Sequence, residues 1–172
     1  MRPHHVALAT AVLVVFAGPP AQAATTAGTL DAWTAPAKVA SIIGPCAKPV
    51  GDDPPSKATP CSTKFVDACS HANGDSTLSI SQCAEAAAVY WRDIVTQRTA
   101  ALEKLRVAAI TKYVQSSDAA WKRYLTTRCS MYGQFEGTIN EILSAECVLD
   151  TTIQRADDLD RYASHASAQG VQ

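Results

Sequence analysis

Proline is confined to the first 60 residues of this 172-residue chain. Six of the nine prolines lie between residues 36 and 60, and none follows. Because proline fixes φ and lacks a backbone N–H, that stretch is not expected to form one long helix but at most a short helical piece around Ala37 to Ile43. From about Leu78 onward alanine, leucine, arginine and glutamate dominate, a composition typical of helices. The sequence therefore predicts a Pro-rich, loop-rich arm and then a helical domain, separated by the turn-forming residues 73–76 (Asn-Gly-Asp-Ser).

Three segments after the arm show the apolar periodicity of amphipathic helices. They cover residues 79–106, 116–136 and 138–163. No run alternates polar and apolar residues with the two-residue period of a strand. The sequence predicts an all-α protein over residues 78–165, a disulfide-stapled helical bundle or hairpin of three main segments. Residues 24–77 form the arm and residues 166–172 a disordered tail.

The ends of these segments leave alternatives. Ser117 is a candidate N-cap of the second segment, although the first two can also run together through residues 111–115. Gly137 ends the second segment. The third shows two apolar faces in succession, which predicts a kink or break near Cys147. The predicted core takes side chains from all three segments: Ile94, Leu105, Trp121, Leu125, Tyr132, Phe135 and Ile153.

Residues 1–23 have the three-part pattern of a secretory signal peptide. Basic residues at positions 2–5 precede an uncharged run, Val6 to Ala17, that is too short to span a bilayer. Residues 21–23 (Ala-Gln-Ala) supply the small-x-small cleavage pattern. The alternative is a buried N-terminal core helix. A signal peptide cleaved near Ala23 predicts a periplasmic or secreted protein with no membrane span after cleavage.

Six cysteines make an even set, which in an exported chain indicates a disulfide framework. No Cys-x-x-Cys spacing occurs, so neither a zinc knuckle nor a thioredoxin-type redox site is favoured. The cysteines of the second and third segments are expected to tie a helical hairpin, while the two earlier pairs can be exchanged. The expected pairs are Cys129–Cys147, Cys69–Cys83 and Cys46–Cys61.

The sequence shows no catalytic constellation. Beyond the signal-like segment only His71 and His165 remain, far apart, and there is no nucleophile elbow or glycine-rich phosphate loop. We therefore predict no catalytic residue, metal or cofactor, and an enzyme acting on an envelope substrate is the least supported hypothesis. The formal net charge of −1 gives no support to a nucleic-acid binder.

Charge is divided unevenly along the helical part. Residues 92–128 carry eight basic side chains against three acidic ones, and residues 136–161 carry seven acidic against two basic. Either antiparallel helices neutralise each other along their edges, or the acidic third segment attracts a cationic partner.

An ordered set of residues in the second and third segments gives the chain a family resemblance. The set comprises Trp121, Tyr124, Cys129, Gly137, Cys147, Thr152, Arg155 and Leu159. It resembles the LprI lysozyme inhibitor family of small exported bacterial domains. With Cys69 and Cys83 as the N-terminal pair, the resemblance covers residues 69–159 and leaves the arm unmatched. That family places an arginine directly after the aromatic residue, where this chain has Leu125, so Arg128 is expected to take over as the buried cation.

The resemblance implies an inhibitor that blocks a cationic, lysozyme-like glycosidase such as a c-type lysozyme. The alternative is a non-catalytic interaction module of the bacterial envelope that binds another envelope protein. For an inhibitor, the expected contact lies at the turn of residues 130–140, held by the Cys129–Cys147 bridge, with Tyr132, Glu136 and Glu141 as candidate contacts. Tyr132 or Phe135 is expected to belong to the core instead. The simpler interpretation is that this turn only connects two helices.

Overall fold

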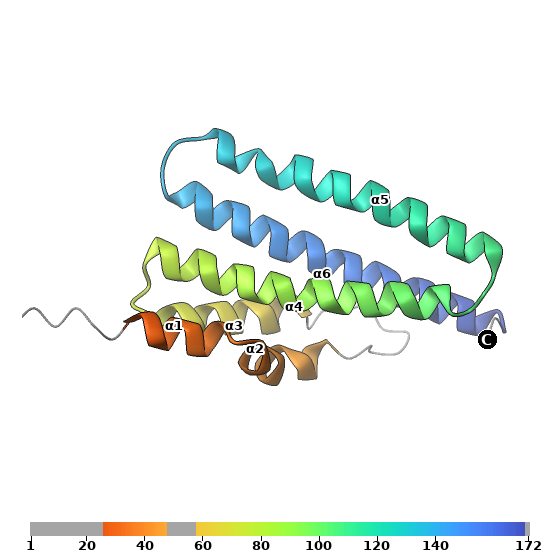
Figure 1. The fold of residues 1–172 in the computed structure, drawn as a ribbon, viewed down its shortest axis with the longest axis horizontal. Coiled ribbons are helices and arrows are strands. Elements are labelled where there is room, and N and C mark those ends of the chain that lie inside the picture. The colour runs from red at the N-terminus through yellow and green to blue at the C-terminus, as the bar shows by residue number, and fades with distance from the viewer. Residues whose placement is uncertain (1–25, 48–57, 171–172) are drawn as a thin grey trace, which may run out of the picture.

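The computed structural model describes residues 26–47 and 58–170, and every regular element in these ranges is helical (Figure 1). The elements are α1 Thr26–Thr34, α2 Pro36–Ile43, the 3-10 turn η1 Gly44–Cys46, α3 Ala58–Ala72, α4 Thr77–Glu103, α5 Ala108–Ser130, the 3-10 turn η2 Tyr132–Gln134, and α6 Ile139–Ala168. The predicted all-α, disulfide-stapled bundle is confirmed. The predicted signal peptide, residues 1–23, lies outside the described residues.

Three long helices, α4, α5 and α6, form the body of the molecule. At 1.5 Å per residue, α4 is about 40 Å long and α6 about 45 Å. The connections at residues 104–107 and 131–138 each reverse the chain, so α5 runs antiparallel to both neighbours (Figure 1). As a result α4 and α6 are parallel and begin at the same end of the bundle. Small buried residues on both helices (Ala84, Ala87, Ala88 and Ala156) let these two backbones pack closely.

The expected short helix around Ala37 to Ile43 is present as α2, whereas the expectation of loop is wrong for α1 and α3, which account for most of the other described residues of the arm. The prolines among the described residues are accommodated because they stand at helix starts. Pro36 is the first residue of α2, and Pro60 lies in the first turn of α3, where backbone N–H groups have no partner within the helix. The turn at residues 73–76 is confirmed: Gly74 has φ +84° there, and α3 ends just before it.

Helices α1–α3 pack on α4 around one indole ring. Trp91 of α4 is fully buried, and its Nε1 donates a hydrogen bond to Ser62 Oγ of α3 at 2.8 Å. Phe65 of α3 is also fully buried, with its ring 6.3 Å from that of Trp33 of α1. The arm helices therefore contribute to the same hydrophobic core as the long helices.

The long helices differ from the predicted segments at several ends. α5 begins at Ala108, so Ser117 is not an N-cap but a residue of the helix interior whose hydroxyl donates to Val114 O. α5 ends at Ser130, and Gly137, with φ +105°, lies in the connection that follows. α6 continues as one helix through Cys147 to Ala168, so the predicted break is wrong, as is the disordered tail for residues 166–168.

The predicted core is correct in part. Ile153 is fully buried, and Ile94, Leu105 and Trp121 are partly buried against the core. Phe135, by contrast, is 60% exposed. The two largest fully buried side chains, Trp91 and Phe65, are absent from the prediction.

The three expected disulfides are all present. Cys46–Cys61 joins η1 to α3, Cys69–Cys83 joins α3 to α4, and Cys129–Cys147 joins the end of α5 to α6. Their Cα–Cα distances are 6.3, 6.0 and 5.6 Å respectively. The last bridge closes the helical hairpin expected from the sequence.

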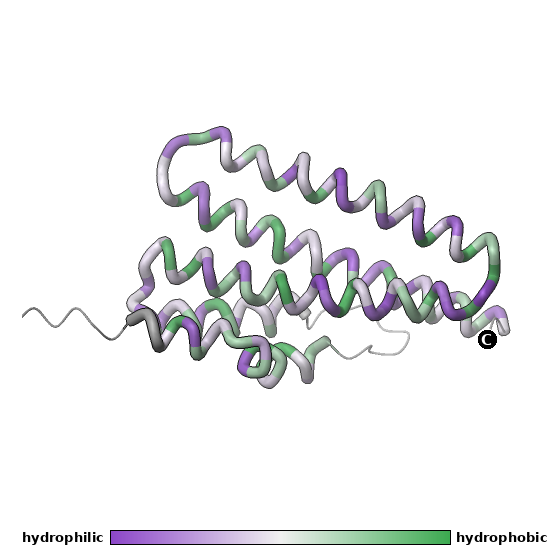
Figure 2. The backbone as a smooth tube through the Cα atoms, in the orientation of Figure 1, coloured by the Kyte–Doolittle hydropathy of each residue, from purple (hydrophilic) through white to green (hydrophobic). Residues whose placement is uncertain are grey.

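Hydrophobic and hydrophilic residues alternate in short stretches along each described helix (Figure 2). None of these helices is long and apolar enough to cross a membrane.

Candidate partner-binding surface

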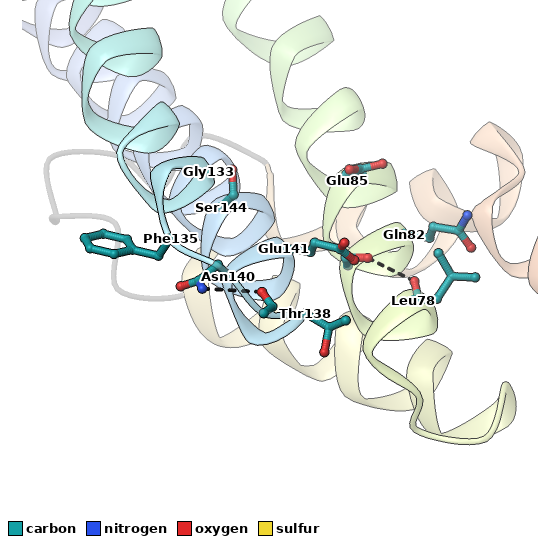
Figure 3. Close-up of a pocket in the computed structure, with 11 residues that line it drawn as sticks. Leu78, Gln82, Glu85, Gly133, Phe135, Thr138, Asn140, Glu141 and Ser144 are labelled. Atoms are coloured by element: carbon teal, nitrogen blue, oxygen red, sulfur yellow. Dashed lines mark hydrogen bonds between the residues drawn. The ribbon is translucent and has the colours of Figure 1, made fainter.

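A groove of about 650 Å³ lies at the end of the bundle where α4 and α6 begin (Figure 3). One wall comes from the first turns of α4, with Leu78, Gln82 and Glu85. The other comes from the α5–α6 connection and the first turns of α6, including Glu141. Figure 3 shows the Glu141 side chain extending from α6 toward α4. We refer to this feature as the acidic groove.

Local bonds fix both walls of the acidic groove. Ser76 caps α4 by accepting a hydrogen bond from Ser79 N at 3.1 Å. In the α5–α6 connection, Asn140 Nδ2 donates to Glu136 O at 2.8 Å and to Gly137 O at 3.3 Å. The Cys129–Cys147 bridge ties the two helices together behind this connection. The groove is therefore built on covalently and hydrogen-bonded helix ends.

Large apolar side chains are exposed at the same end of the bundle. They are Leu78, Met131, Phe135, Ile139 and Leu143, between 37% and 60% exposed. Single exposed apolar residues are ordinary on protein surfaces, whereas a group of them is typical of an interaction site. Of these side chains, Leu78 and Phe135 line the groove, and the Phe135 ring points away from α4 in Figure 3.

The α4 and α6 segments at this end are acidic, although Arg128 in the last turn of α5 lies near enough to Asp150 to oppose the rise in the pKa of that carboxyl. Residues 76–91 and 130–154 carry no lysine, arginine or histidine. They carry five carboxylates: Glu85, Glu136, Glu141, Glu146 and Asp150. None of the five forms an ion pair with another described residue. Burial raises the pKa of Glu146, and the neighbouring carboxylates Asp150 and Asp67 raise it further.

Neutralisation between helices occurs at the other half of α6. Arg98 of α4 forms an ion pair with Asp160 of α6 at 2.9 Å and donates to Ala47 O at 2.7 Å. Burial raises the pKa of the nearby Asp157 to about 6, although Arg98 opposes the shift. Neutralisation between helices is thus seen at the Arg98–Asp160 pair, although α4 and α6 run parallel rather than antiparallel; attraction of a cationic partner by the rest of α6 stays a prediction.

The three candidate contacts, Tyr132, Glu136 and Glu141, differ in their placement relative to the groove. Glu141 is exposed and lines the groove, and Glu136 is exposed in the connection beside it. Tyr132 is half-buried and does not line the groove, whereas Phe135 does. The contribution of α4, including Glu85, is absent from the sequence analysis. The sequence indicates the place of α4 only indirectly. Because two short connections each reverse the chain, α4 and α6 begin at the same end of the bundle.

The ordered residues around Trp121 that the sequence analysis singled out are largely structural. Thr152 and Leu159 are fully buried, and the Thr152 hydroxyl donates to Val148 O. Trp121 is half-buried, and Tyr124 is 52% exposed. Of these residues, Trp121 links the two helices, because its Nε1 donates to Thr151 O of α6.

Arg155, rather than Arg128, is the buried cation of this region. Arg155 is 5% exposed, and its Nη2 donates to Ser117 Oγ at 2.9 Å. Burial of Arg128 is wrong, because its side chain stays on the exterior of α5, although it does lie over an aromatic ring, that of Tyr124, at 5.7 Å. The buried guanidinium also explains why a serine stands inside α5.

Within the described residues, no group of three or more His, Cys, Asp and Glu side chains is placed to hold a metal ion. The model of one protein family, described as lysozyme inhibitor LprI, matches residues 69–159, more than half of the chain. The chain belongs to the LprI lysozyme inhibitor family. The LprI match runs from the first cysteine of the α3–α4 bridge to the buried Leu159, so it includes the acidic groove and the Trp121 region. Comparisons with curated proteins and with solved structures gave no match.

Proposed function

We propose that this LprI-family protein inhibits a cationic, lysozyme-like glycosidase, with the acidic groove as its contact surface. The observation that carries the proposal is that Glu85 of α4 and Glu141 of α6 line one groove and that neither forms an ion pair with another described residue. The family description supports the choice of a lysozyme as partner.

The proposed surface fits such a partner in three ways. The carboxylates steer a cationic enzyme toward this end, which raises the association rate at low salt. Apolar side chains such as Phe135 and Ile139 are available for burial in the complex. Because the disulfide and the cap already fix the helix ends, little conformational entropy is lost on binding. Inhibition then results from occlusion of the enzyme's cleft and requires no catalytic residue.

We also propose that the protein acts outside the cytoplasm, in the periplasm or after secretion. Three disulfides persist only in an oxidising compartment, and residues 1–23 have the signal-peptide pattern. A lysozyme would be encountered in the same compartment.

The test is inhibition of a c-type lysozyme by the oxidised protein, compared with Glu141→Lys and Glu85→Lys. Asp93→Lys is the matched control, since Asp93 is an exposed acid of α4 that does not line the groove. We expect each groove variant to inhibit about tenfold less well at low ionic strength, with a smaller difference at high salt. The control variant should inhibit like the parent.

Two results count against the proposal in different ways. Undiminished inhibition by the Glu85→Lys/Glu141→Lys double variant would move the contact away from the groove. Absence of inhibition by the oxidised parent would contradict the lysozyme target and favour the alternative, an envelope interaction module with another partner.

A further inference from the structure

A second, smaller pocket of about 300 Å³ lies between α5 and α6, away from the acidic groove. Trp121 and Tyr124 of α5 face Gln154, Arg155 and Asp158 of α6 across it. Its volume is at the lower end of the range for small-molecule sites, so it accommodates about one ring and a short substituent.

The Arg155 guanidinium beside this pocket forms no ion pair with a described residue. Arg155 is 5% exposed, and no described carboxylate lies within ion-pairing distance of it. Its one side-chain hydrogen bond goes to the neutral Ser117 hydroxyl, and its buried Nε has no partner in the described part of the chain. A buried guanidinium without a carboxylate is costly unless an anion completes the site.

Two nearby charged pairs make the contrast plain. Arg98 of α4 is also largely buried, and it forms an ion pair with Asp160 of α6 at 2.9 Å. Asp158, which lines the same pocket as Arg155, pairs with Arg161 instead. Acidic residues are thus abundant on α6, yet none neutralises Arg155.

The aromatic walls of the pocket are held in place. Trp121 Nε1 donates to Thr151 O at 3.4 Å, which orients the indole. The Tyr124 hydroxyl accepts a hydrogen bond from Arg128 Nη1 at 3.0 Å, and that guanidinium covers the Tyr124 ring. A flat ligand body can pack against fixed aromatic side chains with little ordering cost.

We propose that this pocket binds a small carboxylate ligand. Its ring-sized body packs against Trp121 and Tyr124, and its carboxylate is paired with the Arg155 guanidinium. Arginine suits this role because its planar fork matches the two oxygens of a carboxylate. The proposal does not depend on lysozyme inhibition, which is assigned to the other end of the bundle.

The test is calorimetric titration of the oxidised protein with two carboxylates, benzoate and N-acetylmuramic acid. Benzamide and N-acetylglucosamine are the neutral counterparts of similar shape. We expect saturable binding of at least one carboxylate and at least tenfold weaker binding of its neutral counterpart. Binding of benzoate alone identifies an aromatic acid as the ligand class, and binding of N-acetylmuramic acid alone identifies an acidic sugar.

Variants locate the binding. Arg155→Lys keeps the charge but loses the fork, and Tyr124→Ala changes an exposed side chain, so the fold does not depend on it. Each is expected to weaken binding about tenfold. Tyr113→Ala is the control, since Tyr113 is an exposed tyrosine of α5 outside the pocket. No saturable binding of either acid up to about 10 mM, or binding unchanged in Tyr124→Ala, would overturn the proposal.

Discussion

Single residues decide how the arm and the bundle become one core, and Trp91 is the main example. Its ring is fully buried, donates to Ser62 of α3, and lies 6.0 Å from the Arg98 guanidinium. The apolar residues that recur at three- and four-residue steps in segment 79–106 include Tyr90 and Ile94 but not Trp91. The reason is that α4 contacts α2 and α3 as well as α5 and α6, so its buried arc is too wide for one stripe to define.

Trp91→Ala is expected to lower the free energy of unfolding by about 3–5 kcal/mol, because it leaves a large cavity in the core. Urea denaturation monitored by circular dichroism measures the loss. Val89→Ala, on the exposed side of the same helix, should cost less than about 0.5 kcal/mol. Equal losses in the two variants would show that Trp91 does not anchor the core.

At the scale of elements, the contact between α4 and α6 includes a carboxyl group, that of Asp157, whose pKa is raised. Asp157 lies near Arg98 and Asp160, and burial raises its pKa from 3.8 to about 6. Below about pH 4 this carboxyl is protonated in both folded and unfolded protein, so it costs nothing. As pH rises through 6 the folded protein must ionise a partly buried group, and its stability falls.

Asp157→Asn should remove this contribution to the pH dependence. Relative to the parent, the variant is expected to gain stability as pH increases from about 4 to about 7. Urea midpoints measured across that range give the comparison, and Asp93→Asn serves as the exposed control on α4. Parallel pH profiles for parent and Asp157→Asn would contradict a raised pKa at this position.

The Cys129–Cys147 bridge closes the α5–α6 hairpin over a sequence separation of 18 residues. Replacing both cysteines with alanine should lower the free energy of unfolding by about 3 kcal/mol, the chain-entropy value for a loop of this size. Chemical denaturation of parent and variant measures the difference. A loss below about 1 kcal/mol would show that the hairpin is fixed without the bridge.

Local chemistry made several elements predictable. Periodicity located the three long helices, and the Asn-Gly-Asp-Ser turn was recognisable from its residues. The positions of the last two cysteines indicated the Cys129–Cys147 bridge, whereas the two earlier pairs were exchangeable from the sequence. The helices of the arm were not predictable from its proline content, because Pro36 and Pro60 occupy helix starts where proline is tolerated. The continuity of α6 through Cys147 was hidden because the helix meets different neighbours along its length, which changes its apolar face.

For the whole molecule, the decisive property is the separation of charge along the bundle. The half of α6 that is paired with Arg98 is neutralised, whereas the half near the α5–α6 connection is not. Glu136 and Glu141 were identifiable from the sequence because they flank a predicted turn. Glu85 and Leu78 were not, since their position depends on α4 and α6 starting at the same end.

The acidic groove as the lysozyme contact is tested most directly by amide chemical-shift mapping. The ¹⁵N-labelled, oxidised protein is titrated with unlabelled c-type lysozyme at low ionic strength. Shifts or line broadening are expected at residues 78–85 and 133–144, with residues 103–113 at the opposite end unchanged. Changes confined to that opposite end, or a spectrum unaffected by lysozyme, would contradict the account.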